Sequence, residues 1–214
     1  MNQYKDLLKE AILFIKSGNI PDTAWSFGGG TALMFYYNHR YSKDIDIFLH
    51  DAQYLTYLTP RLNDYVENKV DDYEEMSNSL KLKMGEHEID FIIAPSLTKI
   101  PFNIINIDDQ DIRIETPEEI VIKKIFYRCE AFKVRDIVDL AVVIKNNKQS
   151  LLSNIEVYKR KLGQLMSRIK RLKDIYPNEV KELEILDVSL VNSAFNIVLN
   201  FVEECIKNTT LSEL

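Results

Sequence analysis

The pattern of apolar residues changes at Thr116, and this change limits the folds that are open to the chain. Before this point apolar and polar residues alternate in short runs such as 45–49, which is typical of strands with one buried face. After it, apolar residues recur at helical spacing without a clear strand. Residues 116–119 have a capping threonine, a proline at the first helical position and a glutamate three residues after the cap. We therefore predict an α+β fold, with a small mixed sheet and flanking helices over 1–115 and an all-helical domain over 116–214.

The expected elements follow from the same periodicities. The first half is predicted to contain helices over 3–16, 31–38 and around 52–68, the last interrupted or started by Pro60. It is also predicted to contain strands over 24–27, 45–49, 80–84, 87–94, 103–107 and 112–115. The second half is predicted to contain helices over 117–130, 133–146, 150–173 and 188–207.

Composition excludes several classes of protein. With 214 residues, 46% of them hydrophobic, the chain is long enough for one large domain or two small ones. Its apolar runs are far shorter than the roughly 18 residues that cross a bilayer, and its first residues lack the layout of an export signal. We expect a cytoplasmic protein with no membrane association. Cys129 and Cys205 stand alone in apolar contexts and are expected to be free core residues.

Three aspartates form the most informative group of polar residues. Asp44 and Asp46 lie two apart on a predicted strand, so their side chains share a face. Asp90 lies on the polar face of the strand over 87–94, and an adjacent antiparallel strand would bring it beside the first two. Carboxylates held this close need a positive charge between them, and oxygen ligands favour Mg²⁺. The same alternation also fits an ordinary half-exposed strand.

Three glycines, Gly28–Gly30, lie between a predicted strand and a predicted helix. Glycines at such a turn let backbone N–H groups approach an anion, and the start of the helix adds partial positive charge. They also fit a simple tight turn. A glycine turn followed by paired acids on the next strand predicts a site for a metal ion and a triphosphate.

The residues around both features resemble a known family. The run G-G-T-A-L, followed by H-R-x-S-x-D-I-D-I-F at 39–48, is similar to the nucleotidyltransferase toxins of the AbiEii/AbiGii type, within the DNA polymerase β-like nucleotidyltransferase superfamily. Residues 119–143, where a lysine precedes R-D-x-x-D-L, are similar to the second conserved block of that family. The resemblance covers about 27–143, and the last 70 residues share only helical character.

The resemblance implies roles for residues of the first half. Gly29, Gly30 and Thr31 would hold the nucleotide phosphates. Asp44 and Asp46 would bind a divalent metal ion, Mg²⁺ or Mn²⁺. Asp90 matches the third carboxylate of the superfamily, which contacts the metal and acts as the base on the attacking hydroxyl.

The resemblance also implies roles in the second half. Lys124 matches the lysine that reaches the triphosphate, with Lys123 as the alternative, and Asp136 matches the acid of the R-D pair.

Arg40 and Ser42 flank the acids of the first half, where they either contact phosphate or tie the strand end to the glycine turn. Neither His39 nor His50 has a partner at the spacing of metal ligands. We therefore expect surface or capping positions for both.

As a function, the resemblance implies a metal-dependent nucleotidyltransferase that transfers a nucleotide from a nucleoside triphosphate to an acceptor. The expected acceptor is RNA, at a tRNA end, and the expected role is the toxin of a toxin–antitoxin or phage-defence pair, with an antitoxin as partner. One alternative is transfer to a small-molecule or protein hydroxyl. Another is a catalytically silent member that only binds a nucleotide or a partner protein.

One segment departs from the overall acidic balance. The net charge is −6, yet residues 159–173 contain seven cations and no acid. Such a segment fits a solvated helix face, and it also fits a track for the phosphates of an RNA acceptor.

Overall fold

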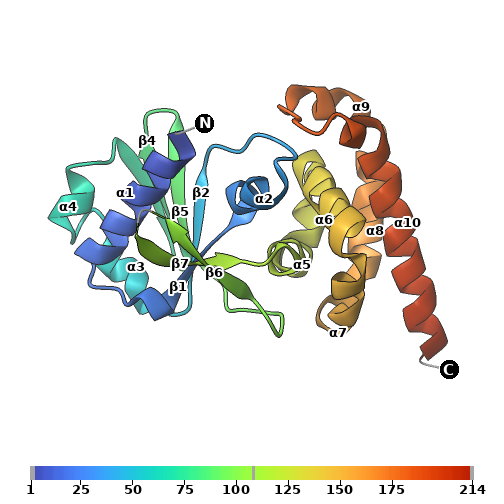
Figure 1. The fold of residues 1–214 in the computed structure, drawn as a ribbon, viewed down its shortest axis with the longest axis horizontal. Helices are drawn as coiled ribbons and strands as arrows, with labels where there is room; N and C mark the ends of the chain where they lie inside the picture. Colours follow the sequence, from blue (N-terminus) through green and yellow to red (C-terminus); the bar gives the residue numbers. More distant parts are fainter. Residues whose placement is uncertain (1–2, 108, 213–214) are drawn as a thin grey trace. The chain divides into compact units, whose positions relative to one another are not determined.

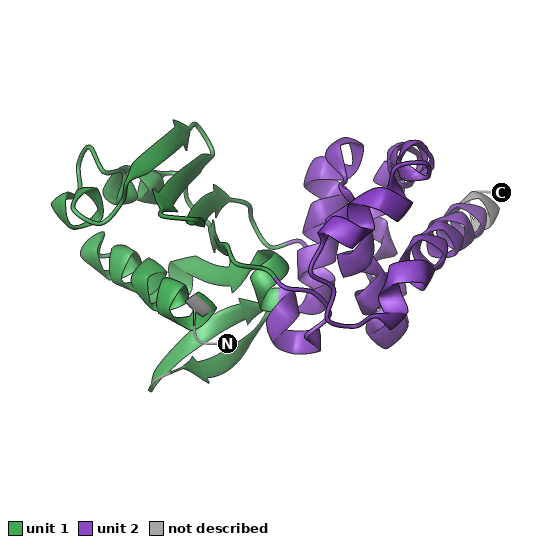
Figure 2. Cartoon of the chain, turned by 90° about the horizontal axis from the view of Figure 1, so that it is seen from above, with its two compact units in different colours: residues 1–32, 42–96, 102–115 green, residues 33–41, 97–101, 116–214 purple. Residues whose placement is uncertain are grey.

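The computed structural model describes residues 3–107 and 109–212. The chain forms two compact units (Figure 2). The first unit comprises residues 1–32, 42–96 and 102–115, and the second comprises 33–41, 97–101 and 116–214.

The first unit contains a seven-stranded sheet with helices beside it (Figure 1). Its helical elements are α1 (Gln3–Ser17), the short 3-10 helix η1 (Asp22–Ala24), α3 (Gln53–Leu58) and α4 (Asp64–Glu67), and α2 (Gly29–Tyr37) starts in this unit. Its strands are β1 (Trp25–Gly28), β2 (Ile45–Leu49), β3 (Asp72–Met76), β4 (Ser79–Met84), β5 (His87–Ile93), β6 (Phe102–Ile107) and β7 (Gln110–Glu115).

The sheet is mixed, with the strand order β3-β4-β5-β2-β1-β7-β6. The pairs β1/β7 and β2/β5 are parallel, and the other four pairs are antiparallel. The central strand β2 therefore lies between β1 and β5. The mixed sheet with flanking helices and the helical second half confirm the predicted fold class.

Strand alternation builds the core of this unit. Ile45, Ile47 and Leu49 are fully buried, while Asp46 and Phe48 between them are partly exposed. The helix α1 packs against β2 and β5 and lies over the sheet in Figure 1. One face of β2 thus supplies the core, which leaves the other face for polar chemistry.

The helix expected around 52–68 is interrupted near Pro60, and one strand of this unit was not predicted. The expected helix is two short helices, α3 and α4, because the backbone turns extended at Thr59, just before Pro60. The strand β3 was not predicted. Its five residues carry three acids and are largely exposed, since it is an edge strand, so it shows no apolar alternation.

The second unit contains the helices of the C-terminal half. They are α5 (Pro117–Arg128), α6 (Val134–Ser153), α7 (Ile155–Tyr158), α8 (Leu162–Leu172), α9 (Tyr176–Glu179) and α10 (Ser189–Ser212), with 3-10 turns η2 (Cys129–Ala131), η3 (Lys159–Lys161) and η4 (Val180–Glu182). The predicted start of α5 is confirmed, because the Thr116 hydroxyl accepts a hydrogen bond from the Glu119 N–H. The helix α10 packs against α6 and α8.

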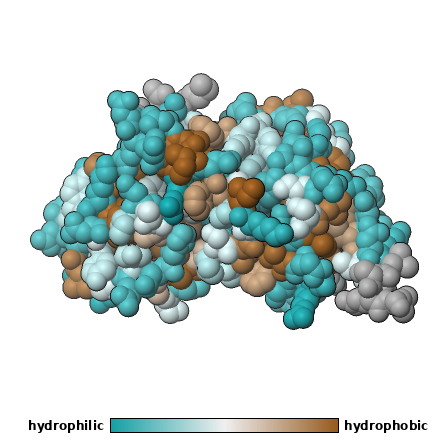
Figure 3. Space-filling model, turned by 60° about the horizontal axis from the view of Figure 1, so that its bottom comes forward, coloured by the Kyte–Doolittle hydropathy of each residue, from teal (hydrophilic) through white to brown (hydrophobic). Residues whose placement is uncertain are grey.

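Both cysteines are free and buried, as predicted. No helix in the described part of the chain is long and apolar enough to cross a membrane. The face in Figure 3 is largely hydrophilic, with hydrophobic residues in small separate patches.

Candidate active site

Asp46 lies next to both the glycine turn and Asp90. It is the second residue of β2, partly exposed between buried isoleucines. Across the antiparallel pair β1/β2 it lies opposite Gly28. Across the parallel pair β2/β5 it lies opposite Asp90. Asp44 directly precedes the strand and is partly exposed.

Only glycine fits at the start of α2. Gly29 has a φ of +70°, a conformation that favours glycine. A Cβ atom at this position would lie 1.8 Å from Asp46 Oδ2 and 2.4 Å from its Cγ. The Asp46 carboxylate therefore packs directly against the backbone where the helix begins, and the glycine is required by this contact as well as by the turn.

The next residues of α2 are buried. Gly30 and Thr31 are both buried, and the Thr31 hydroxyl donates a short hydrogen bond to the carbonyl oxygen of Asp44. This bond fixes the end of the loop that leads into β2. The first N–H groups of a helix have no partner within the helix and carry partial positive charge. The geometry places this positive end beside the Asp46 carboxylate.

Asp90 lies beside Asp46, but on a parallel strand. The antiparallel arrangement expected from the sequence was wrong, because β5 forms its antiparallel pair with β4 on its other side. Burial and the neighbouring Asp46 carboxylate raise the pKa of Asp90 from its usual 3.8 to about 6, although Lys81 acts in the opposite direction. The Lys81 Nζ atom lies 3.3 Å from Asp90 Oδ2.

This raised pKa predicts that Asp90→Asn stabilises the metal-free protein at neutral and alkaline pH. The carboxyl ionises near pH 4 in the unfolded chain and near pH 6 in the folded one. The folded state therefore loses stability as the pH rises through this window and does not regain it above. One pKa unit corresponds to about 1.4 kcal/mol, so the loss is at most about 3 kcal/mol.

Urea unfolding in EDTA over this pH range measures the effect. We expect the variant to gain stability over the wild type only as the pH rises from about 4 to about 6. A difference between the two proteins that is constant with pH would contradict the raised pKa.

The two carboxylates fit a divalent cation. They offer oxygen atoms from neighbouring strands, and repulsion from Asp46 adds to burial in raising the pKa of Asp90. Within 3–107 and 109–212, no group of three or more His, Cys, Asp or Glu side chains is arranged to hold a metal ion by itself. Mg²⁺ is usually held by one or two carboxylates together with water and substrate phosphates, so a complete protein cage is not required.

Arg40 lies in the second unit, where it binds a residue to which no role was assigned. Its guanidinium makes two hydrogen bonds to Asp139, from Nε at 2.6 Å and from a terminal nitrogen at 2.9 Å. His39 Nε2 lies 2.8 Å from the same carboxylate. His39 is fully buried, so the expected surface position was wrong, whereas His50 is exposed.

Lys124 and Asp136 belong to the same buried network. The Lys124 ammonium lies 3.1 Å from Asp136 and also contacts Asp139. Asp136 accepts further hydrogen bonds from Arg128 and from the N–H of Lys133, where it caps α6. Burial alone would raise the pKa of Asp139, but Arg40 and Lys124 hold it well below its usual range.

The neighbouring Lys123 is also buried, but it faces a different partner. Its Nζ atom lies 3.6 Å from Glu119, and the Glu119 carboxylate accepts hydrogen bonds from the backbone of Leu97 and Thr98. Ser42, the remaining predicted residue, is half-buried in the loop before β2 and belongs to the first unit.

A family match identifies the chain. Residues 12–190 match the family described as "Nucleotidyl transferase AbiEii toxin, Type IV TA system". The chain belongs to this family. It is therefore a nucleotidyltransferase, an AbiEii protein that uses a nucleoside triphosphate, and its family is defined by toxins of toxin–antitoxin systems.

Solved structures resemble the fold of this AbiEii protein. ANT(2″)-Ia in complex with adenylyl-2″-tobramycin is 15% identical, with 75% of this chain and 99% of that chain covered and a TM-score of 0.55. The solution structure of the antibiotic-resistance factor ANT(2″)-Ia is 14% identical, covering 80% and 100%, with a TM-score of 0.55. JHP933 from Helicobacter pylori is 16% identical, covering 100% and 96%, with a TM-score of 0.49. No curated protein matches the chain.

Sequence reasoning missed two residues of this AbiEii protein. Asp139 is the second acid of R-D-x-x-D-L, one helical turn after Asp136, and this spacing could have indicated a shared partner. Lys81 alternates with Leu80 and Leu82 on β4 and carries no signal until the strand partners are known.

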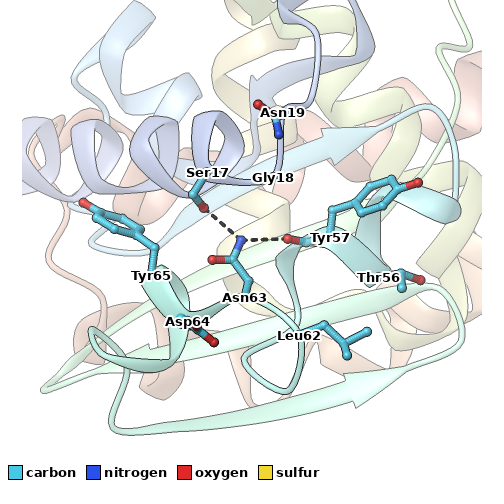
Figure 4. Close-up of a pocket in the computed structure, with 9 residues that line it drawn as sticks. All are labelled: Ser17, Gly18, Asn19, Thr56, Tyr57, Leu62, Asn63, Asp64 and Tyr65. Atoms are coloured by element: carbon cyan, nitrogen blue, oxygen red, sulfur yellow. Dashed lines mark hydrogen bonds between the residues drawn. The ribbon is translucent and has the colours of Figure 1, made fainter.

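A separate pocket lies away from the predicted site residues. It has a volume of about 500 Å³ and is lined by Ser17, Gly18, Asn19, Thr56, Tyr57, Leu62, Asn63, Asp64 and Tyr65. Figure 4 shows the Asn63 amide between the Ser17 hydroxyl and the Tyr57 carbonyl, to which it donates hydrogen bonds. The Asn63 amide thus joins the end of α1 to the α3–α4 loop.

Proposed function

We propose that this AbiEii protein transfers a nucleotide from a nucleoside triphosphate to RNA, at a tRNA end, in a reaction that depends on Mg²⁺ or Mn²⁺. It would act in the cytoplasm as the toxin of a toxin–antitoxin or phage-defence pair with a cognate antitoxin. The observation that carries the proposal is the place of Asp46, against Gly29 at the start of α2 and opposite Asp90 on β5.

The reaction would use these groups as follows. An acceptor hydroxyl forms a bond to the α-phosphorus, and the bond from that phosphorus to the bridging oxygen of the β-phosphate breaks, releasing pyrophosphate. A bound divalent cation would neutralise the charge that develops on the phosphate oxygens. Asp46 and Asp90 would hold it together with water and phosphate oxygens, with Asp44 from the loop before β2 as a third ligand in the nucleotide complex. Asp90 would also take the proton of the attacking hydroxyl, as the third carboxylate of the site.

The glycine turn would hold the triphosphate. Backbone N–H groups of Gly29, Gly30 and Thr31 lie at the start of α2, where anions are favoured. The Thr31 hydroxyl donates a hydrogen bond to the carbonyl oxygen of Asp44, so the side chain would hold the loop in place. The backbone N–H of Thr31 would remain part of the anion-binding start of α2. Ser42, half-buried two residues before Asp44, completes the proposed phosphate-binding set.

The second half would form the helical domain, over 116–214, after a nucleotidyltransferase core over 1–115. Arg40 and Lys124 both pair with Asp139, and Lys124 also pairs with Asp136. We therefore assign them a positioning role, in which they fix the segment over 38–41 that leads to Ser42 and Asp44.

The basic segment over 159–173 supports RNA as the acceptor. Arg160, Lys170, Arg171 and Lys173 are exposed along η3 and α8, while the apolar face of α8 is buried. Arg168 is different, because its Nε donates a hydrogen bond to the carbonyl oxygen of Phe132. The exposed cations offer a surface for phosphates.

Charge reversal tests this surface. Changing Lys170, Arg171 and Lys173 to glutamate is expected to weaken RNA binding and to lower the salt dependence of binding by about two to three counterions. Reversal of two exposed lysines outside the basic segment, Lys181 and Lys207, serves as the control and should have a smaller effect. An unchanged affinity and salt slope in the triple variant would exclude the basic segment as the RNA surface.

The proposed function is tested by incubating the protein with each of four labelled nucleoside triphosphates and total RNA, with Mg²⁺, Mn²⁺ or EDTA. Metal-dependent label in the RNA supports the proposal. Parallel incubations contain protein or small-molecule acceptors in place of RNA. Label in one of these acceptors, with none in RNA, would show that the hydroxyl acceptor is not RNA. Nucleotide binding without any transfer would identify a silent member of the family.

A further inference from the structure

Lys81 lies beside the carboxylates that would hold the metal ion. It lies on β4 directly opposite Asp90 on β5, and Asp90 lies directly opposite Asp46 on β2. Directly opposed residues on neighbouring strands project from the same face. Lys81, Asp90 and Asp46 therefore form one row across three adjacent strands, which Figure 1 shows side by side.

The lysine contacts two acids at once. Its Nζ atom lies 3.3 Å from Asp90 Oδ2 and also contacts the Glu88 carboxylate. Glu88 lies two residues before Asp90 on the same strand, so it shares the face. Asp90 is the more buried of the two, with 22% of its side chain exposed against 36% for Glu88.

We propose that Lys81 is a built-in competitor of the metal ion, whose ammonium neutralises Asp90 in the metal-free protein and keeps only its contact with Glu88 when the metal binds. This inference rests on the proposed function, because it assumes that Asp46 and Asp90 hold the metal. Lys81 then sets how much divalent cation the protein needs.

The charges make this exchange reasonable. Without a cation, Asp46 and Asp90 repel each other, and the lysine lessens the repulsion from one side. A divalent cation between the two aspartates supplies twice the charge of the ammonium and reaches both carboxylates. Lys81 keeps an ion pair throughout, since Glu88 remains within reach, so only one of its two contacts is lost.

The test measures binding of Mn²⁺ to the nucleotide-free protein by calorimetry. Lys81→Met is expected to tighten Mn²⁺ binding by about twofold to fivefold, the equivalent of one partly exposed ion pair. It is also expected to lower the melting temperature in EDTA and to enlarge the rise on adding Mn²⁺. Lys81→Arg, which keeps the charge, should bind Mn²⁺ like the wild type.

Lys83 provides a matched control. It lies two residues further along β4, is 32% exposed against 30% for Lys81, and pairs with Asp72 and Glu74. Lys83→Met should leave Mn²⁺ affinity unchanged. Glu88→Gln acts in the opposite direction, because it removes the second partner of Lys81, and it should weaken Mn²⁺ binding by about threefold.

The experiment distinguishes a failure of the proposed metal site from a failure of the proposed role of Lys81. If the wild type does not bind Mn²⁺, or if Asp46→Asn binds it as well as the wild type, the proposed metal site is wrong. If the wild type binds Mn²⁺ and Asp46→Asn does not, unchanged or weaker binding by Lys81→Met overturns only the role of Lys81. Should Lys81→Met not fold, unchanged or tighter binding by Glu88→Gln overturns it equally.

Discussion

Replacing Asp46 with alanine is expected to lower nucleotidyl transfer by about 100-fold or more and to leave the fold intact. The carboxylate is the group shared by the glycine turn and the acidic pair, so its loss removes a preorganised charge partner. The fold should persist because the side chain is only partly buried and because its removal relieves repulsion with Asp90. Incorporation of labelled nucleotide by the purified variant, with its melting temperature, provides the measurement.

Glu74→Ala is a suitable control for this variant. Glu74 lies in the same row of residues, opposite Lys81 on the edge strand β3, but it is 52% exposed and pairs with Lys83. Transfer by this variant should stay within about twofold of the wild type. A folded Asp46→Ala protein that still transfers nucleotides would refute the assignment of Asp46.

Replacing Asp139 with alanine is expected to destabilise the protein by about 3–5 kcal/mol. Asp139 is fully buried and neutralises Arg40 and Lys124 while it also binds His39. Removing it leaves buried cations without their shared partner, which is far more costly than losing an exposed pair. Denaturant unfolding at neutral pH measures the loss.

Glu204→Ala gives the contrasting case in the same unit. Glu204 pairs with Lys148 at 2.7 Å, but both side chains are over 40% exposed. Its loss should change stability by less than about 1 kcal/mol. If Asp139→Ala were as mild as Glu204→Ala, the network would contribute little to the fold, and the positioning role of Arg40 and Lys124 would have to be abandoned.

Local patterns predicted the parts of the fold that depend on neighbours in the chain. The alternation at 45–49 identified β2, and the glycines identified the turn into α2, because both are properties of a few consecutive residues. The hairpin of β4 and β5 and the start of α5 were predicted for the same reason. The alternation of β2 is also sufficient to place Asp46 on the polar face of the strand.

Features that depend on distant partners were not predictable in this way. Asp90 lies on a parallel strand, and its register with Asp46 is set by the whole sheet. The pairing of Lys81 with Asp90 requires the order of β4, β5 and β2. Asp139 and Arg40 are 99 residues apart, so neither spacing nor periodicity connects them.

The register of β2 has a consequence for how this protein can vary. Its odd positions form the core and its even position 46 meets the glycine turn and Asp90, so one five-residue stretch specifies both packing and chemistry. Inserting or deleting a single residue there would turn isoleucines toward solvent and the acid toward the core. Functional variants are therefore expected to keep the length of this strand constant, while changes in length should accumulate in the loops around α3.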